Sequence, residues 1–446
     1  MSSGVLTAGN GQTWENDLVA ALDRPGTGLT VVRRCVDIAD VLAVAATGQV
    51  SVVLVSAGLR RLDTDAVQRL LSGGVAVIAI CPAGDQRARE RLDRIGVTAC
   101  VADDAGPAAL VAAARTAAAG LRTDDAGRRS SQRAVADPRS AFDDGESGDR
   151  APGVSEPAMP EDPPPAGRVV AIWGPAGSPG RSMLAGNLAA EAAESGVPTL
   201  LVDADVYGGV QSSAFGLLDE SPGLAGACRL AANGRLDLTE LTRLVWAVGP
   251  ALRLLTGISR ADRWPEIRPS SLPAVLAVCR SMARLTIVDC GFCLEADEEI
   301  TFDTVAPRRN GATLAVLADA DEVVVVGSAD PPGMERLVRG LAELGEMVPE
   351  ATPTVVLNRS RRSAASTEES AAALARFSGL SVRASLPEDR AATDRAWQLG
   401  VPLLQAASGS ALRKGVRQLA AALAAAGIPT RMPEPAGATA GRPSED

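Results

Sequence analysis

Residues 169–182 read VVAIWGPAGSPGRS. The apolar run Val169–Trp173 leads into a glycine-rich loop, and a helical pattern with Leu184, Leu188 and Ala192 on one face follows. A strand, a glycine-rich loop and a helix in this order are the context of a phosphate-binding loop, where backbone N–H groups and the helix N-terminus face an anion. This stretch therefore predicts a phosphate-binding loop at residues 174–182 of an α/β domain.

The loop residues have distinct expected roles. Gly177 and Gly180 allow the backbone to approach a phosphate closely, and Ser182 offers a hydroxyl to Mg²⁺, which prefers oxygen ligands. Arg181 pairs with phosphate and assists catalysis. The expected nucleotide contacts in the loop are Gly177, Ser178, Pro179, Gly180, Arg181, Ser182 and Met183.

The loop departs from the standard pattern G-x-x-x-x-G-K-[ST] at two positions. Its first glycine would fall on Pro175, and its lysine is replaced by Arg181. An arginine forms a planar fork on a phosphate where a lysine acts as a point charge, so the geometry of phosphate contact differs.

Carboxylates follow two further apolar runs. Thr199–Val202 ends in Asp203 and Asp205, and Leu285–Val288 ends in Asp289. The carboxyl ends of parallel strands meet beside the phosphate site of an open α/β sheet. We expect Asp289 and Asp203 to bind Mg²⁺ together with Ser182, and Asp205 to orient the attacking water. An aspartate at a strand end is otherwise a helix N-cap, and this alternative remains open.

Composition divides the chain into segments. Residues 122–167 contain no Leu and no Ile and are rich in Pro, Gly, Ser and charged residues, which predicts a disordered linker. Residues 429–446 are similar and predict a disordered tail. The two folded units are therefore expected at residues 1–121 and 168–428.

Both units alternate strand-like and helical patterns, which predicts two doubly wound parallel sheets of the α/β class. In the first unit the expected strands are 29–32, 52–55, 75–80 and 98–101. In the second they are 169–173, 199–202, 252–255, 285–288, 322–326, 354–357 and 381–385. Helix 411–426 has few cations and no aromatic anchor, so we expect it to pack on the domain and not on a membrane.

Bulk properties exclude several classes of protein. The net charge of −10 argues against DNA as a partner, because phosphate neutralisation needs clustered cations. The absence of histidine excludes Ser-His-Asp catalysis and His-ligated metals. Seven scattered cysteines and the lack of a signal peptide or long apolar run predict reduced thiols in a cytoplasmic protein. The spacing Cys290-x-x-Cys293 is redox-like, but no second pair completes a zinc site.

Together these motifs resemble the MinD/ParA family of deviant Walker ATPases over roughly residues 168–426. The family pattern K-G-G-x-G-K-[ST] falls on residues 176–182, its second acidic motif on residues 202–205 and its Walker B motif on Val288 and Asp289. The resemblance implies that ATP or ADP binds with Mg²⁺ and that the protein forms a homodimer.

The resemblance also assigns a base pocket. It implies that Asn358 meets adenine and that Pro387 belongs to the loop closing the pocket. The family's signature lysine is here Ala176, and the Pro expected after Walker B is Gly291. With Arg181 in place of the second lysine, we expect weak or absent hydrolysis, because such charge donors contribute about 10³-fold or more in rate.

The first unit resembles a response-regulator receiver domain. A receiver accepts phosphate on an aspartate at the end of its third strand, but the corresponding run here, 52–55, is followed by Ser56 and Ala57. Residues 6–10, which correspond to the end of a receiver's first strand, lack the usual acidic pair. We interpret it as a pseudo-receiver, with an unrelated flavodoxin-like domain as the alternative.

A pseudo-receiver before a MinD-like domain resembles the CpaE/TadZ branch. This resemblance implies a positioning protein for pilus or secretion machinery or for septum placement, with protein partners of that apparatus. It also implies peripheral association at the inner face of the membrane or at the cell pole. The alternative is an active ParA/MinD-type ATPase in chromosome partitioning or septum-site determination.

Overall fold

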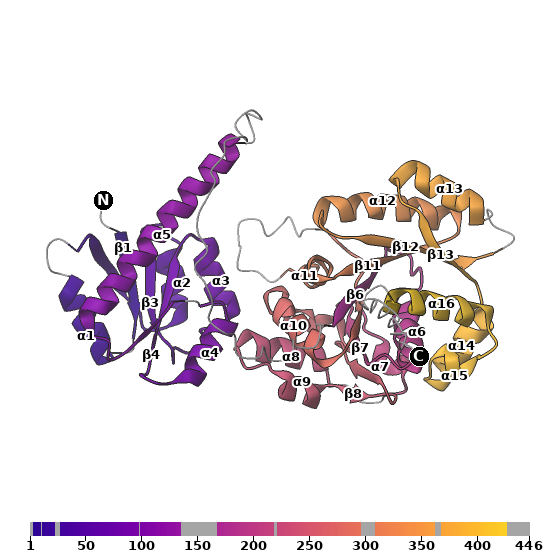
Figure 1. Cartoon of the computed structure of the whole chain (residues 1–446), viewed down its shortest axis with the longest axis horizontal. Coiled ribbons are helices and arrows are strands. Elements are labelled where there is room, and N and C mark those ends of the chain that lie inside the picture. The colour runs from indigo at the N-terminus through magenta and orange to yellow at the C-terminus, as the bar shows by residue number, and fades with distance from the viewer. Residues whose placement is uncertain are drawn as a thin grey trace, which may run out of the picture.

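The computed structural model describes residues 3–9, 11–22, 27–97, 99–134, 167–217, 221–295, 308–361 and 367–425. They form two α/β units, each with a parallel sheet between layers of helices (Figure 1). The predicted fold class is confirmed. The tail at 429–446 and most of the expected linker lie outside the described residues.

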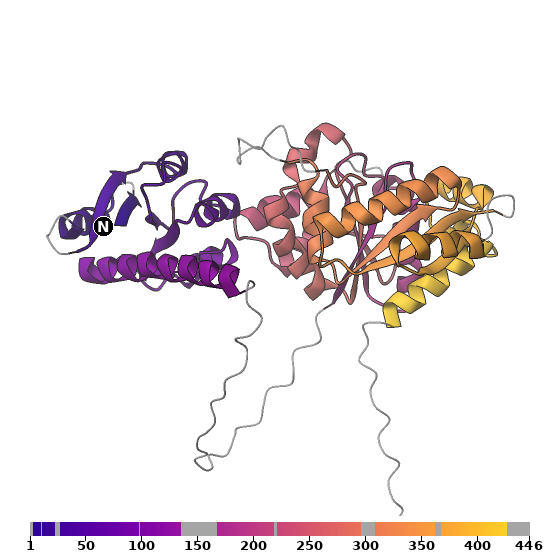
Figure 2. The same ribbon diagram turned by 90° about the horizontal axis from the view of Figure 1, so that it is seen from above.

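The first unit has five parallel strands in the order β2-β1-β3-β4-β5. This order is that of flavodoxin-like folds. Its elements are β1 (Ser3–Ala8), α1 (Thr13–Leu22), β2 (Leu29–Arg34), α2 (Ile38–Ala45), β3 (Val52–Ser56), α3 (Thr64–Ser72), β4 (Ala76–Cys81), α4 (Gln86–Arg94), β5 (Ala99–Ala102) and α5 (Gly106–Ala134). Helices α1 and α5 cover one face of the sheet, and α2, α3 and α4 cover the other (Figure 2).

Helix α5 continues to Ala134, past residue 121 where composition predicted the start of the linker, and Leu110, Ala114 and Ala118 pack its first part on the sheet. One expectation for this unit is wrong. Cys81 and Cys100 form a disulfide, whereas reduced thiols were expected throughout. Pairing of β4 with β5 brings these two cysteines together, and spacing along the chain does not reveal this.

The second unit has an eight-stranded sheet in the order β13-β12-β11-β6-β10-β7-β9-β8. All neighbours are parallel except β8 and β9. The strands are β6 (Arg168–Trp173), β7 (Thr199–Ala204), β8 (Trp246–Ala247), β9 (Leu252–Leu255), β10 (Leu285–Cys290), β11 (Glu322–Ser328), β12 (Pro353–Ser360) and β13 (Val382–Pro387). In this unit only the short edge strand β8 had no counterpart among the expected strands.

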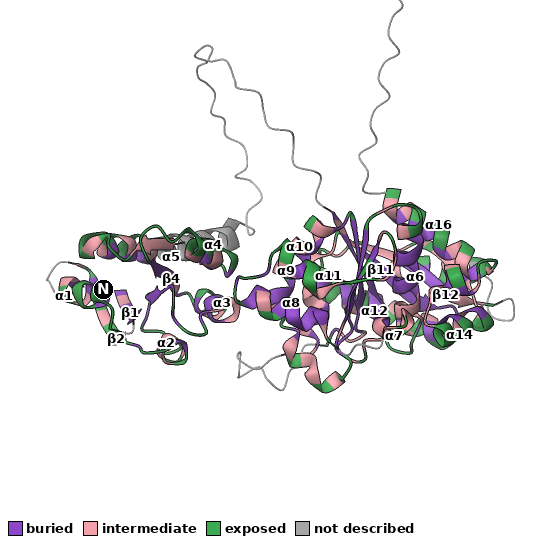
Figure 3. Ribbon diagram, turned by 90° about the horizontal axis from the view of Figure 1, so that it is seen from below, coloured by how far each residue is buried: buried purple, intermediate pink, exposed green. Residues whose placement is uncertain are grey.

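The helices of the second unit cover both faces of this sheet. They are α6 (Arg181–Glu194), α7 (Gln211–Ala214), α8 (Gly223–Ala232), α9 (Leu238–Leu244), α10 (Leu272–Met282), α11 (Gly311–Asp319), α12 (Pro331–Met347), α13 (Thr367–Ser378), α14 (Arg390–Leu399), α15 (Leu403–Ala406) and α16 (Ala411–Ala425), with 3₁₀ turns η1 (Ala261–Glu266) and η2 (Pro269–Ser271). Alternate residues of β6 face opposite sides, as the pleat requires: Val170 and Ile172 pack with α6 and α16, and Val169 and Trp173 with α10 and α12. Figure 3 shows buried strands at the centre of this unit and exposed residues on the covering helices.

Helix α16 packs on the domain, as expected. Leu412, Val416 and Leu419 are buried against α6 and β13, and Arg413 pairs with the buried Glu191 at 2.6 Å. Within the described residues, no helix is long and apolar enough to cross a membrane.

The two units touch through α3 of the first and the α8–η2 region of the second (Figure 1). Arg268 donates to Asp65 at 2.8 Å and to Asp63 at 3.2 Å. Ser270 also donates to Asp65, and Arg94 donates to the carbonyl of Gly234 at 3.0 Å. The contact is therefore mainly polar and involves charged groups at the surface.

Candidate functional site: a phosphate loop and its carboxylates

The predicted loop lies between β6 and α6, at the carboxyl edge of the sheet. Gly177 and Gly180 adopt φ of 101° and 100°, values that favour glycine, and Gly180 is the N-cap of α6. Ser178 also adopts a positive φ of 51°, which is uncommon for a residue with a side chain. Such backbone conformations concentrate at ligand sites, and here they bend the loop around the start of a helix.

Arg181 folds back over its own loop. It donates to the carbonyls of Gly174 and Pro175, each at 3.2 Å, and its Nη2 lies 3.9 Å from Asp205. These partners hold the guanidinium between the loop and the second acidic motif. Contact of Arg181 with a phosphate would replace at least some of these hydrogen bonds.

Strand pairing brings the predicted carboxylates together. Asp289 of β10 lies opposite Asp203 of β7 in the parallel register, and both are buried. Burial raises the pKa of Asp289 to about 6, while hydrogen bonds from Gln211 and Ser182 oppose this rise. Burial and the charge of Asp289 raise the pKa of Asp203 well above its ordinary value. The site thus concentrates negative charge that a cation would neutralise.

Asp203 and Asp205 also organise the segment after β7. Asp203 accepts from the backbone N–H of Asp205 at 3.3 Å and of Gln211 at 3.0 Å. Asp205 accepts from the backbone N–H of Tyr207 at 2.8 Å. In this structure both carboxylates therefore fix a loop, and Asp205 faces the phosphate loop through Arg181.

The acidic side chains of the site do not form an all-protein metal cage among the residues that the structure describes. Within the described residues, no group of three or more acidic or cysteine side chains is arranged to hold a metal ion. Mg²⁺, however, usually binds through one or two carboxylates, waters and substrate phosphates. Asp289 Oδ1, Gln211 Oε1 and Arg181 Nε are buried here without a hydrogen-bond partner among the described residues, so polar groups are available to a ligand.

A cavity of about 390 Å³ adjoins the loop. Four residues expected to contact nucleotide line it, namely Gly180, Met183, Asn358 and Pro387. Asn358 donates to the carbonyl of Pro179 at 2.8 Å, and a side chain at position 180 would collide with the Asn358 amide nitrogen at 2.4 Å. Strand β12 and the phosphate loop therefore meet where the sequence predicted the base pocket.

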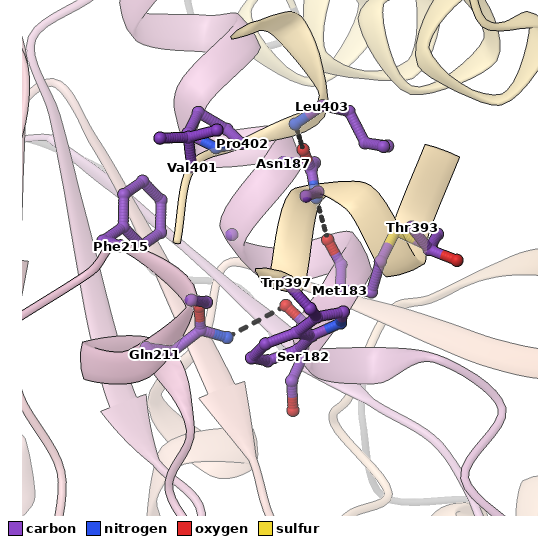
Figure 4. A pocket seen from close by; sticks show the side chains of 13 residues that line it. Ser182, Met183, Asn187, Gln211, Phe215, Thr393, Trp397, Val401, Pro402 and Leu403 are labelled. Carbon is purple, nitrogen blue, oxygen red and sulfur yellow. Dashed lines mark hydrogen bonds between the residues drawn. The ribbon is translucent and has the colours of Figure 1, made fainter. Parts of the chain in front are cut away.

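A second, small cavity lies behind the start of α6. Figure 4 shows Trp397 beside Ser182 and Met183, with Gln211 donating to the Ser182 carbonyl. Asn187 in the same view bridges Met183 and Leu403 by hydrogen bonds of 2.8 and 2.7 Å. Trp397 is 41% exposed and lines both cavities.

Several solved structures are similar to this chain. They include a ParA family ATPase from Chlorobium tepidum TLS, with 21% identity, a TM-score of 0.49 and coverage of 57% of this chain and 99% of that chain. The cell division ATPase MinD of Pyrococcus furiosus has 17% identity and a TM-score of 0.47, covering 58% and 98%. Septum site-determining MinD with Mg-ADP from Pyrococcus horikoshii OT3 has 17% identity and a TM-score of 0.45, covering 57% and 95%.

No protein-family model matches the chain, and no curated protein matches its sequence. The functional argument therefore rests on the residues of this chain.

Gln211 is a residue of the candidate site that sequence reasoning missed. It is fully buried, and its amide nitrogen donates to Asp289 Oδ2 at 2.7 Å and to the Ser182 carbonyl at 2.9 Å. It therefore links the Walker B-like strand to the phosphate loop. A glutamine on a four-residue helix carries no pattern of its own, so only the contacts reveal it.

Cys290 and Cys293 are free thiols in the structure. Burial and the neighbouring charge of Asp289 raise the pKa of Cys290 well above its ordinary value. Reactive cysteines have the opposite property, a lowered pKa, so the burial of Cys290 does not favour redox chemistry at this thiol. Trp173 at the end of β6 is buried and belongs to the core of the second unit.

Proposed function

We propose that the second unit binds ATP or ADP with Mg²⁺ at the loop 174–182. The observation that carries this proposal is the convergence of unpartnered buried polar atoms from three elements on one phosphate loop. Ser182, Asp203 and Asp289 would hold Mg²⁺, and Asp203 also accepts hydrogen bonds from the loop that follows β7. Asn358, Pro387 and the adjoining cavity would receive the base. Bound Mg²⁺ would neutralise the charge that the buried carboxylates concentrate.

Binding is tested by calorimetry with Mg²⁺-ATP and Mg²⁺-ADP on the wild type, Gly180→Ala and Gly196→Ala. Both glycines have a positive φ, so each substitution strains the backbone, but only position 180 meets Asn358. We expect Gly180→Ala to weaken binding about tenfold or more, because it displaces loop amides that would bind a charged phosphate. Gly196→Ala should bind as the wild type does. Absence of wild-type binding at millimolar nucleotide contradicts the proposal.

We further propose that hydrolysis is slow or absent. Ala176 replaces the lysine expected from the family pattern, and Arg181 is engaged by loop carbonyls. The phosphoryl-transfer transition state spreads negative charge over the equatorial oxygens. Ala176 has no charge and Arg181 is held by loop carbonyls, so these two residues neutralise that charge poorly. Asp205 would orient the attacking water. Arg181 would be the one side chain of the loop that stabilises negative charge in the transition state.

Turnover assays of three proteins test this point. The isolated wild type should turn over ATP slowly, and Ala176→Lys combined with Arg181→Lys should raise the rate. Asp205→Ala shows whether any residual turnover depends on that carboxylate. Brisk, Asp205-dependent hydrolysis by the wild type without a partner would instead support the alternative, an active ATPase in partitioning or septum-site determination.

The cellular role that fits slow hydrolysis is a nucleotide-dependent scaffold of the CpaE/TadZ type. In this proposal a nucleotide-bound homodimer positions pilus, secretion or division machinery at the membrane or pole, and the first unit is a pseudo-receiver. Its β3 ends in Ser56, so acetyl phosphate should leave residues 1–121 unmodified. Detection of an acyl-phosphate there by mass spectrometry would overturn the pseudo-receiver assignment.

A further inference from the structure

Helix α12 packs directly on the phosphate loop. A side chain at Gly340 would approach Pro175 and Trp173, each at 3.2 Å, so the helix and the loop are in close contact at this glycine. Residues four apart lie on the same face of a helix, and position 336 is therefore the next contact along this face. Pro175, which replaces a glycine of the standard loop, forms part of this packing surface.

The side chain of Arg336 lies against the loop at Gly177. A Cβ at Gly177 would lie 2.9 Å from Nε and 3.0 Å from Cζ of Arg336. The guanidinium thus occupies the space that a side chain at position 177 would need. Gly177 follows Ala176, where the family pattern has its signature lysine.

Arg336 has no close acidic partner. Among the described residues no carboxylate forms an ion pair with it, although it is partly buried. By contrast Arg339, one turn further on the exposed side, pairs with Glu335 at 2.6 Å. The charge of Arg336 contributes to the lowered pKa of Asp330, after the larger effect of the hydrogen bond from Ser328. A cation held beside a phosphate loop without an ion pair is available to an anion.

No lysine of the chain is available for this role. Ala176 has no charge, Arg181 is engaged with loop carbonyls and Asp205, and the only lysine is Lys414 on α16. We propose that Arg336 binds the phosphate tail of the nucleotide from within the same chain, supplying the positive charge that the altered loop lacks. This inference rests on the proposed nucleotide binding.

The test compares calorimetric affinities of the wild type, Arg336→Ala, Arg336→Lys and the matched control Arg339→Ala for Mg²⁺-ATP and Mg²⁺-ADP. Loss of a charge-assisted phosphate contact corresponds to about 10- to 100-fold weaker binding. We expect this loss in Arg336→Ala, partial recovery in Arg336→Lys and no change in Arg339→Ala. A loss confined to ATP places the contact on the γ-phosphate, and an equal loss for ADP places it on the inner phosphates.

Circular dichroism and the melting temperature without nucleotide separate binding from folding. If Arg336→Ala fails to fold, Arg336→Gln replaces it in the comparison, because glutamine keeps a long polar side chain without the charge. If the wild type binds nucleotide and the uncharged variant binds both nucleotides equally well, the proposed role of Arg336 is wrong. The proposed nucleotide binding is then unaffected. Absence of binding by the wild type overturns the proposed function and this inference together.

Discussion

At the scale of single residues, the raised pKa of Asp289 makes the stability of the nucleotide-free protein depend on pH. Its folded-state pKa of about 6 lies above the ordinary value of 3.8, so between these pH values the folded chain holds more protons than the unfolded chain. The free energy of unfolding therefore falls as the pH rises through this window and levels off above it. The ionised carboxylate thus destabilises the unliganded fold at neutral pH.

Asp289→Asn should stabilise the nucleotide-free protein at pH 7.5, because it removes the buried charge and keeps an oxygen to accept from Gln211. The gain is up to about 3 kcal/mol for a shift of roughly two pKa units. Urea unfolding at pH 5 and 7.5 measures this gain. The difference in the free energy of unfolding between the variant and the wild type should be larger at pH 7.5. Asp394→Asn, at an exposed position on α14, is the control and should show no such gain. A less stable Asp289→Asn protein at pH 7.5 would contradict this account.

At the scale of elements, the packing of α12 on the phosphate loop should distinguish two glycines of one helix. Gly345 has no atom within 4 Å of a built Cβ, so Gly345→Ala should raise stability by about 0.5–1 kcal/mol through helix propensity alone. Gly340→Ala gains the same propensity but presses on Pro175 and Trp173. We therefore expect Gly340→Ala to be less stable than Gly345→Ala by about 1 kcal/mol or more.

Thermal and urea unfolding of the two variants measure this difference. Nucleotide affinity is the second readout, because movement of α12 displaces both Pro175 and Arg336 relative to the loop. Gly345→Ala should leave affinity unchanged. Equal stability of the two alanine variants would show that α12 is not tightly packed on the loop.

At the scale of the whole molecule, Arg268 connects the two units through Asp63 and Asp65. Exposed ion pairs contribute about 0–1 kcal/mol each, so this contact should orient the units without determining their folding. Arg268→Glu places a negative charge opposite the carboxylates of Asp63 and Asp65. We expect a larger radius of gyration in small-angle scattering and almost unchanged unfolding of each unit.

Arg243→Glu is the control, because Arg243 pairs with Glu240 inside α9 and touches neither carboxylate. Its scattering should match that of the wild type. An unchanged radius for Arg268→Glu would mean that other contacts, such as that of Arg94 with Gly234, hold the units together.

The sequence by itself determined the α/β class, the phosphate loop and the carboxylates beside it. Buried parallel strands are continuous apolar runs, so their ends are visible in the sequence. Because such strands end at the same edge, Asp203 and Asp289 could be expected to lie together, and β7 and β10 pair in that register. The fold of the loop follows from local residues, since Gly177 and Gly180 supply the positive φ values that it needs.

The tertiary structure alone decided which distant side chains complete the site. Gln211 reaches Asp289 across 78 positions, and Asn358 reaches Pro179 across 179. Arg336 and the Cys81–Cys100 disulfide likewise depend on which elements become neighbours. Local patterns report the environment along one strand or helix, whereas these contacts depend on the order in which strands cross the sheet and on how closely a helix packs upon it.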